Sequence, residues 1–426
     1  MALEEPEATT PSQKEPGAAQ RGHLGAVGEA WGRVPQRLRR RLPLILVLTA
    51  AALYPVYVDN LPTDIPVVKQ FPTLFSAVVM LVFTQMALGL NIVVGYAGLL
   101  DLGYVAFYAA GAYMAGWLAS QQFAQITAHF GAVGISPTLP GIHISIWLIL
   151  ILAGLFTALV GIIIGLPTLR LRGDYLAIVT LGFGEIVPQF VRNGDNFGGF
   201  NLTAGTFGLA PIDSPGFGQG LHKAIGLPVT FHSSYDKDKL FYWGILALLL
   251  FTVFCSVRLR DSRLGRAWIA IREDETAAAA MGVPLMRTKT WAYAIGAFFG
   301  GVAGAYYASF KQGAFPADFY FNISIFLLSM VILGGIGSIW GVITGGVILS
   351  WLNIEGLANI GNSLKIHDAP RYQFGIYGLI IVVMMLFRPQ GLIPERRRKR
   401  EFEEGVHDRP LYEERYADEP GAGERA

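Results

Sequence analysis

Long apolar stretches constrain this chain more than any other feature of its sequence. Crossing about 30 Å of hydrocarbon takes roughly 20 predominantly apolar residues, because a spanning helix must bond all of its own backbone groups. Charged residues make up only 15% of the 426 residues, well below the roughly 25% of soluble domains. The sequence therefore predicts an all-α polytopic membrane protein with about ten transmembrane helices. The apolar stretches lie at 42–58, 74–94, 103–120, 143–166, 174–191, 240–257, 290–309, 320–336, 339–355 and 373–387.

Basic residues predict which connecting segments face the cytoplasm, because cytoplasmic loops carry an excess of Lys and Arg. The loops at 59–73, 121–142 and 310–319 carry at most one Lys or Arg each. If roughly ten spans alternate from a cytoplasmic N-terminus, every arginine cluster falls on the cytoplasmic side. We therefore predict that both termini are cytoplasmic. The clusters lie at 33–41, 170–172, 258–289 and 388–400.

These features divide the chain into three regions. Residues 1–41 are rich in Ala, Gly, Pro and Glu and predict a disordered cytoplasmic tail. Residues 42–390 form the predicted transmembrane domain, in which 192–239 is a turn-rich external loop. Residues 391–426 are a charged cytoplasmic tail, whose Arg396–Arg400 run predicts contact with anionic membrane lipid rather than nucleic acid.

The polar segment 258–289 interrupts the apolar pattern with a short, well-punctuated helix. Asp274 is a good N-cap, and the residues from Thr276 to Met281 are mostly strong helix formers. Gly282 supplies the residue after the helix and Pro284 prevents continuation. A capped helix of about 10 Å between two membrane spans suggests a docking knob for another protein. An ordinary cytoplasmic loop with one helical turn is the alternative.

Glycines suggest how the helices pack and where they break. Gly296, Gly300 and Gly304 recur every four residues, which lets helix backbones approach closely. The segments 95–103 and 334–341 break apolar stretches at corresponding places in the two halves of the chain. Broken helices at such positions often mark a transport pathway.

Polar residues inside apolar stretches are candidates for a substrate pathway or a gate. An ionisable side chain at the centre of a membrane helix costs roughly 2.5–3.5 kcal/mol on insertion, so it usually faces protein or water. Glu185 is the clearest case, and Gln189 lies one turn further along the same helix. A structural hydrogen bond and a pathway role both remain open for Glu185. Further candidates are Asn91, Asp101, Asn353 and Glu355, of which Asp101 and Glu355 can also be residues at helix ends.

Signatures of an enzyme or a metal site are missing from the sequence. It contains no G-x-x-x-x-G-K-[ST] phosphate loop, no H-E-x-x-H motif and no paired Cys/His spacing. The single cysteine, Cys255, leaves no disulfide framework. His129, His143 and His232 lie in or beside predicted external loops, where an ordinary solvated role is expected. We expect no catalytic residue, metal or cofactor in this chain.

Three stretches, 89–113, 171–186 and 262–282, give the chain a family resemblance. Together they resemble the permease subunit of a branched-chain amino-acid ABC transporter of the LivM type, over about 74–393. The third stretch is similar to the E-A-A-x-x-x-G loop of such permeases. Aligned on Gly282, it has Thr276 where that pattern has Glu, followed by Ala277 and Ala278. Glu273 and Glu275 are therefore alternative acidic residues for holding the helix.

The resemblance implies a complex in the bacterial inner membrane. A second related permease would complete the path, an external binding protein would deliver the amino acid to loop 192–239, and two cytoplasmic ATPases would bind the ATP. The residues implied to face the ATPases are Arg263, Arg266, Arg272, Glu273, Asp274, Glu275, Ala277, Ala278 and Gly282.

Other readings of the sequence remain open. Related permeases for urea or short amides share this architecture. An ion-coupled secondary transporter would use Glu185 or Asp101 as its proton or sodium site. An intramembrane enzyme would need a nucleophile and a base within the membrane segments, and the sequence offers no such pair.

Overall fold

Helices dominate the part of the chain that the computed structural model describes, which comprises residues 36–58, 71–132, 138–171, 173–215, 234–359 and 372–394. The chain divides into two units, Met1–Asn60 and Leu61–Ala426. Residues 1–35 and 395–426, which make up most of the two predicted cytoplasmic tails, lie outside the described residues. The first unit contains the described helix α2 (Gln36–Tyr57), which covers the apolar stretch at 42–58.

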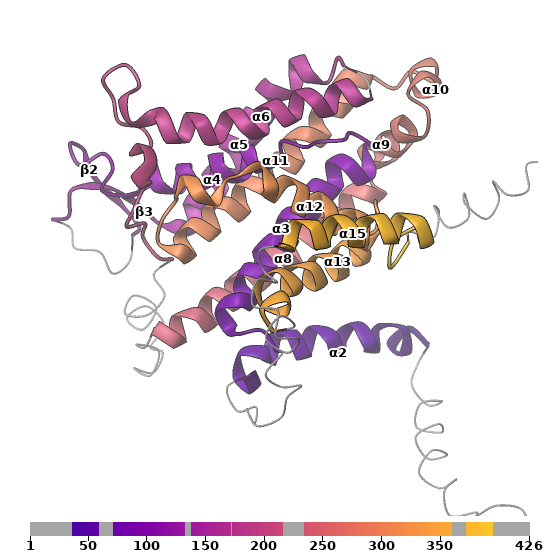
Figure 1. Cartoon of the computed structure of the whole chain (residues 1–426), viewed down its shortest axis with the longest axis horizontal. Helices are drawn as coiled ribbons and strands as arrows, with labels where there is room; N and C mark the ends of the chain where they lie inside the picture. The colour runs from indigo at the N-terminus through magenta and orange to yellow at the C-terminus, as the bar shows by residue number, and fades with distance from the viewer. Residues whose placement is uncertain are drawn as a thin grey trace, which may run out of the picture. The chain divides into compact units, whose positions relative to one another are not determined.

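The helices of the second unit begin and end close to the remaining apolar stretches (Figure 1). Two of them, α3 and α13, continue into π-helical turns, η3 (Ile92–Tyr96) and η8 (Leu352–Gly356). Two further helices, α9 (Arg263–Glu273) and α10 (Glu275–Ala280), lie within the polar segment. The helices that match apolar stretches are α3 (Leu74–Asn91), α4 (Val105–Leu118), α5 (Ile146–Thr168), α6 (Asp174–Asn193), α8 (Ser234–Asp261), α11 (Leu285–Lys311), α12 (Phe321–Gly334), α13 (Ile339–Trp351) and α15 (Gln373–Phe387).

Five helical segments among the described residues are long and apolar enough to cross a membrane. A mostly helical, polytopic membrane protein is therefore confirmed, whereas about ten spans stays a prediction. The five segments are Leu74–Tyr96, Ile146–Thr168, Lys237–Asp261, Pro316–Gly334 and Ile339–Asn359.

Helix α11 lies at the centre of the second unit, where it packs against α3, α4 and α5. The glycines of α11 allow the backbones of neighbouring helices to approach it closely. A Cβ atom at Gly304 would overlap the backbone oxygen of Tyr108 on α4, and one at Gly296 would overlap the Val93 side chain. The four-residue glycine spacing therefore serves helix packing, as the sequence predicts.

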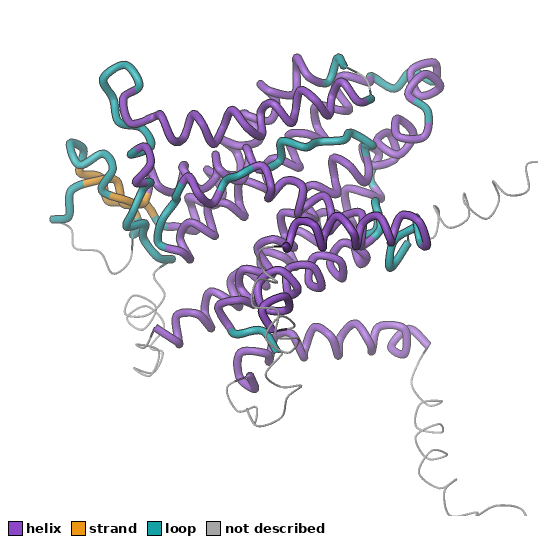
Figure 2. Tube along the Cα trace, viewed as in Figure 1, coloured by secondary structure: helices purple, strands orange, loops and turns teal. Residues whose placement is uncertain are grey.

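A small sheet departs from the all-α prediction (Figure 2). Strand β1 (Ala119–Ser120) pairs antiparallel with β3 (Gly141–Ile144), and β2 (Thr127–Phe130) pairs parallel with β3. Two predicted spans, 103–120 and 143–166, therefore lose a few residues each to strands. The segment between them was expected to be a loop, because strands this short leave almost no periodic signal. β-Branched side chains such as Ile142 and Ile144 favour the extended backbone here.

Connecting segments of the second unit gather at two opposite ends, with α9 and α10 at one end and the strands at the other (Figure 1). At the first end, the N–H of Ile393 donates to the Gly334 carbonyl at 3.1 Å. At the other end, the Leu209 N–H donates to the Ala314 carbonyl at 3.0 Å. Helices that cross the membrane in alternating directions must have their connecting segments at these two ends. Which end faces the cytoplasm stays a prediction.

Candidate functional site

The short helix predicted in the polar segment is present as α10, and both of its ends are capped. One carboxylate oxygen of Asp274 accepts hydrogen bonds from the N–H groups of Thr276 and Ala277, at 2.7 and 2.9 Å. At the other end Gly282 has a φ of +85°, and the Val283 N–H donates to the Ala278 carbonyl at 3.0 Å. This is a Schellman ending, which satisfies carbonyls that a helix otherwise leaves free. We call residues 274–283 the knob.

An ion pair holds the knob against helix α11. The ammonium group of Lys289 lies 2.8 Å from a carboxylate oxygen of Glu275. The Lys289 side chain is only 4% exposed, whereas that of Glu275 is 28% exposed. Glu273 is exposed at the end of α9. Of the two acidic residues that the sequence leaves open, Glu275 is therefore the one that fastens the helix.

The knob has one buried and one exposed face. Ala278 is buried, whereas Ala277 and Gly282 are exposed. Met281 is 85% exposed at the tip. An exposed methionine beside small side chains is the kind of adaptable apolar surface that suits a protein partner.

Helix α9 precedes the knob and was not predicted. Ser262 caps it by accepting a hydrogen bond from the Gly265 N–H at 3.1 Å. Trp268 is fully buried, and its indole N–H donates to the Thr288 carbonyl of α11 at 2.8 Å. The apolar spacing of Leu264, Trp268 and Ile271 (i, i+4, i+7) is the signal that could have revealed this helix.

The arginines of α9 divide into two kinds. Arg263 and Arg266 are exposed, and Arg266 donates to the nearby Asp261 carbonyl at 3.0 Å. Arg272 is half-buried, and its guanidinium donates to the Gly95 carbonyl in the first broken hairpin. A Cβ atom at Gly98, where φ is +68°, would lie 2.5 Å from the Arg272 side chain. Arg272 therefore joins the polar segment to the hairpin at 95–103.

The two glycine-broken hairpins contact each other through Asn91. Its side-chain oxygen accepts a hydrogen bond from the Gly337 N–H at 2.9 Å, and both groups are buried. Asp101 is also buried, and its carboxylate accepts from the Gly103 N–H at 2.8 Å. Both predicted pathway residues therefore bond backbone N–H groups of the broken segments, and the second carboxylate oxygen of Asp101 has no hydrogen-bond partner among the described residues.

The remaining polar candidates are distributed over separate places. Glu355 accepts a hydrogen bond from the Thr73 N–H at 2.8 Å, and Asn353 accepts from the Tyr377 hydroxyl at 2.6 Å. Glu185 and Gln189 are exposed on α6. The four predicted pathway residues, Asn91, Asp101, Glu185 and Gln189, therefore do not form one site within the described chain.

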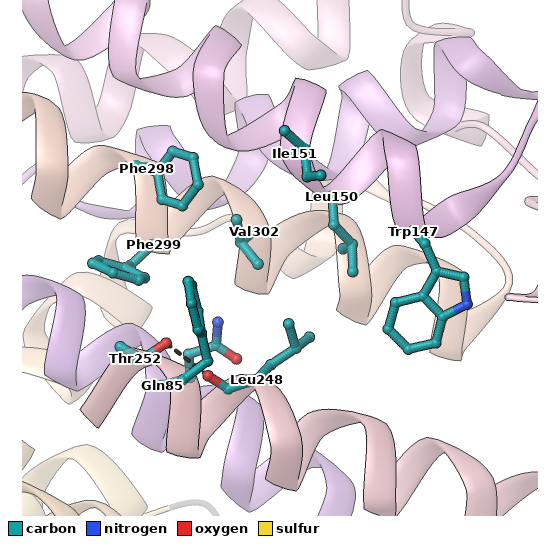
Figure 3. A pocket seen from close by; sticks show the side chains of 10 residues that line it. Gln85, Trp147, Leu150, Ile151, Leu248, Thr252, Phe298, Phe299 and Val302 are labelled. Carbon is teal, nitrogen blue, oxygen red and sulfur yellow. Dashed lines mark hydrogen bonds between the residues drawn. The ribbon is translucent and has the colours of Figure 1, made fainter. Parts of the chain in front are cut away.

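A cavity of about 320 Å³ opens between α3, α5, α8 and α11 (Figure 3). Its walls are mainly aromatic and aliphatic, and the buried amide of Gln85 is without a hydrogen-bond partner among the described residues. The Thr252 hydroxyl already donates to the Leu248 carbonyl at 2.9 Å. A zwitterionic amino acid would leave its ammonium and carboxylate groups largely unpaired in such a cavity, which is costly. The cavity therefore does not suit an amino acid.

His143 is not solvated, contrary to the expectation from the sequence. It is buried, and its Nδ1 lies 2.7 Å from a carboxylate oxygen of Asp213, while the His129 ring stacks on it at 5.0 Å. Burial raises the pKa of Asp213, and the bond to His143 opposes that shift. Among the residues that the structure describes, no cluster could hold a metal ion. His232 lies outside them.

Comparison with known proteins gives consistent matches. The family described as "Branched-chain amino acid transport system / permease component" matches residues 73–385. The chain is 36% identical over 370 residues to the high-affinity branched-chain amino acid transport system permease protein LivM of Salmonella typhimurium, covering 84% of this chain and 76% of that protein. LivM of Escherichia coli K12 is 35% identical over 379 residues, covering 87% and 78%.

A second permease type also matches, over a shorter length. The branched-chain amino acid permease protein LivH of Escherichia coli K12 is 29% identical over 171 residues, which cover 40% of this chain and 51% of that protein. No solved structure matches the chain significantly.

Proposed function

The chain belongs to the family of branched-chain amino acid transport permease components, and we propose that it couples partner ATPases to amino-acid passage through the knob at 274–283. It is a permease subunit of an ABC importer for branched-chain amino acids in the bacterial inner membrane. The match to both LivM and LivH indicates a pair of related permeases in such a system.

The capped and fastened knob is the observation that carries the coupling role. A partner protein can transmit its movement to the permease only through a segment that is rigid and firmly attached to the transmembrane helices. Asp274 and Gly282 close the ends of α10, and the ion pair between Glu275 and Lys289 holds it on α11. Exposed Met281 and Ala277 supply the contact surface. In this proposal two ATPases bind ATP and contact the knob. Their movement is then transmitted through the knob to α11.

The neighbouring contacts extend that connection into the transmembrane helices. Arg272 joins α9 to the first hairpin at Gly95, and Asn91 joins that hairpin to the second one at Gly337. A displacement of α9 would therefore be transmitted to both glycine-broken hairpins. Broken helices are the places where transporters often form their substrate sites.

Cross-linking within the assembled complex tests the coupling role. In a Cys255→Ser background, Ala277→Cys should cross-link to an ATPase subunit. The matched control is Phe207→Cys, whose native side chain is 85% exposed at the opposite end of the second unit. This control should cross-link to no ATPase and should react with an impermeant maleimide added outside the cell. External labelling of Ala277→Cys would contradict the proposal.

Uptake by the reconstituted complex tests the cargo. Proteoliposomes containing this chain, its partner permease, the ATPases and the external binding protein should accumulate leucine, isoleucine or valine when ATP is supplied. Phenylalanine and urea serve as competing substrates. Accumulation of urea alone would identify the related amide-transporting type instead.

A further inference from the structure

Helix α6 turns a mixed apolar and polar face away from the rest of the chain. Ile178, Ile186 and Phe190 are exposed there, and Glu185 and Gln189 lie among them. Among the described residues, no side chain or backbone group bonds the Glu185 carboxylate. We call these five residues the outer face of α6.

The opposite side of α6 is already occupied. Leu176, Ala177 and Thr180 are buried, and the Thr180 hydroxyl accepts a hydrogen bond from the Leu102 N–H at 3.0 Å. Gly184 packs closely against Gly103. Because these contacts fix the rotation of the helix, Glu185 cannot turn inward to find a partner within the described chain.

Lipid is an unfavourable neighbour for the outer face of α6, because the face contains two polar side chains. Glu185 is the twelfth of 20 residues in α6, about 16 Å from the start of the helix at 1.5 Å per residue. An ionisable side chain that faces lipid near the middle of the membrane is costly to insert. A second polar residue, Gln189, lies one turn further along the same face and adds to that cost.

Helix α5, which is one of the five segments apolar enough to cross a membrane, shows what a lipid-facing surface looks like here. Helix α5 exposes Ile151, Leu155, Leu159 and Ile163, and it contains no charged residue. The contrast between the two exposed surfaces indicates that α5 faces lipid and α6 faces protein.

We propose that the outer face of α6 is the surface on which the second permease subunit packs, with polar groups of that subunit bonding Glu185 and Gln189. This inference rests on the proposed function, which supplies a related permease as partner. If α6 spans the membrane as the sequence predicts, a second permease can reach Glu185, whereas an ATPase or an external binding protein cannot. Gly182 supports close packing of a partner, because a Cβ atom there would have no other described segment within 4 Å.

Photo-cross-linking in the intact complex tests the interface. Ile186→Cys and Ile163→Cys, each carrying a cysteine-reactive benzophenone in a Cys255→Ser background, form a matched pair, since the native side chains are 59% and 60% exposed. On illumination, the probe at 186 should cross-link to the second permease, whereas the probe at 163 should label lipid. Equal yields at both positions, or a permease cross-link only from 163, would overturn the inference.

A charge-removing variant gives an independent readout. Glu185→Leu should leave the yield of this chain expressed alone unchanged. It should reduce the amount of second permease that co-purifies by about tenfold, because a hydrogen bond to a charged group contributes roughly 1.5–3 kcal/mol. Ile163→Leu is the control and should retain the partner fully. Full retention by Glu185→Leu would refute the interface.

The wild-type complex separates failure of the inference from failure of the proposed function. If it neither retains a second permease nor accumulates amino acid with ATP, both ideas fail. If it does both while the probe at 186 labels only lipid, the α6 interface alone is wrong.

Discussion

Removing the acidic partner of the buried lysine gives the most direct test of how the knob is held. Glu275→Ala deletes the carboxylate but keeps a good helix former at the first position of α10. Lys289, whose side chain is only 4% exposed in the intact protein, then loses that counter-charge. Lys289→Met deletes the other partner, fills a similar volume and leaves a carboxylate that water can reach.

The two variants should differ in size of effect for a structural reason. Removing one partner of a fully buried ion pair costs about 3–5 kcal/mol. Because Glu275 is 28% exposed, water screens part of the interaction, and we expect roughly 2 kcal/mol for Glu275→Ala. Lys289→Met should cost at most about 1 kcal/mol, because a methionine stem packs well and the freed carboxylate is hydrated.

Hydrogen exchange measures this difference directly. The amides of Met281, Gly282 and Val283 bond within the knob, so their exchange reports its opening. A loss of about 2 kcal/mol corresponds to roughly 30-fold faster exchange, against at most about fivefold for Lys289→Met. The double variant should exchange like Lys289→Met. Equal protection in Glu275→Ala and wild type would refute the idea that this ion pair fastens the knob.

Three further variants test other parts of the structure. Gly282→Val places a β-branched side chain at a φ of +85°, which should let ATP hydrolysis continue while uptake falls, with normal membrane insertion as the control. Asn91→Ala leaves the buried Gly337 N–H without its acceptor, so the thermal midpoint of the purified chain should fall by the equivalent of about 1–3 kcal/mol. Asp213→Ala should destabilise the chain by a similar 1–3 kcal/mol or so, by removing the partner of buried His143, and an unchanged midpoint would show that this bond contributes nothing.

The sequence predicted the apolar helices and the knob well, because both are determined by residues that are neighbours in the sequence. Hydrophobic length places helices such as α3 and α13 within a few residues. Capping chemistry involves neighbours in sequence, so Asp274 and Gly282 could be assigned from the sequence and are found in those roles.

Contacts between distant segments could not be predicted in the same way. Nothing in the sequence near Lys289 indicates that it reaches Glu275, and nothing near Asn91 points to Gly337, 246 positions away. The exposure of Glu185 likewise depends on how α6 rotates against α4, which tertiary packing decides. The sequence identifies Asn91 and Glu185 as unusual, but only the fold shows that Asn91 makes a buried hydrogen bond and that Glu185 lies on an exposed face.

The difference between buried, hydrogen-bonded polar residues and exposed ones indicates where the amino acid crosses the membrane. Asn91 and Asp101 are buried and accept hydrogen bonds from backbone N–H groups of the broken hairpins, so a substrate could reach them only if the helices around them moved apart. The cavity beside Gln85 offers too few polar groups for a zwitterion. Glu185 and Gln189 are the exposed candidates among the four predicted pathway residues, and they lie on the outer face of α6. A path between two permeases, bordered by that face, is therefore more consistent with the chemistry than a path through this subunit alone.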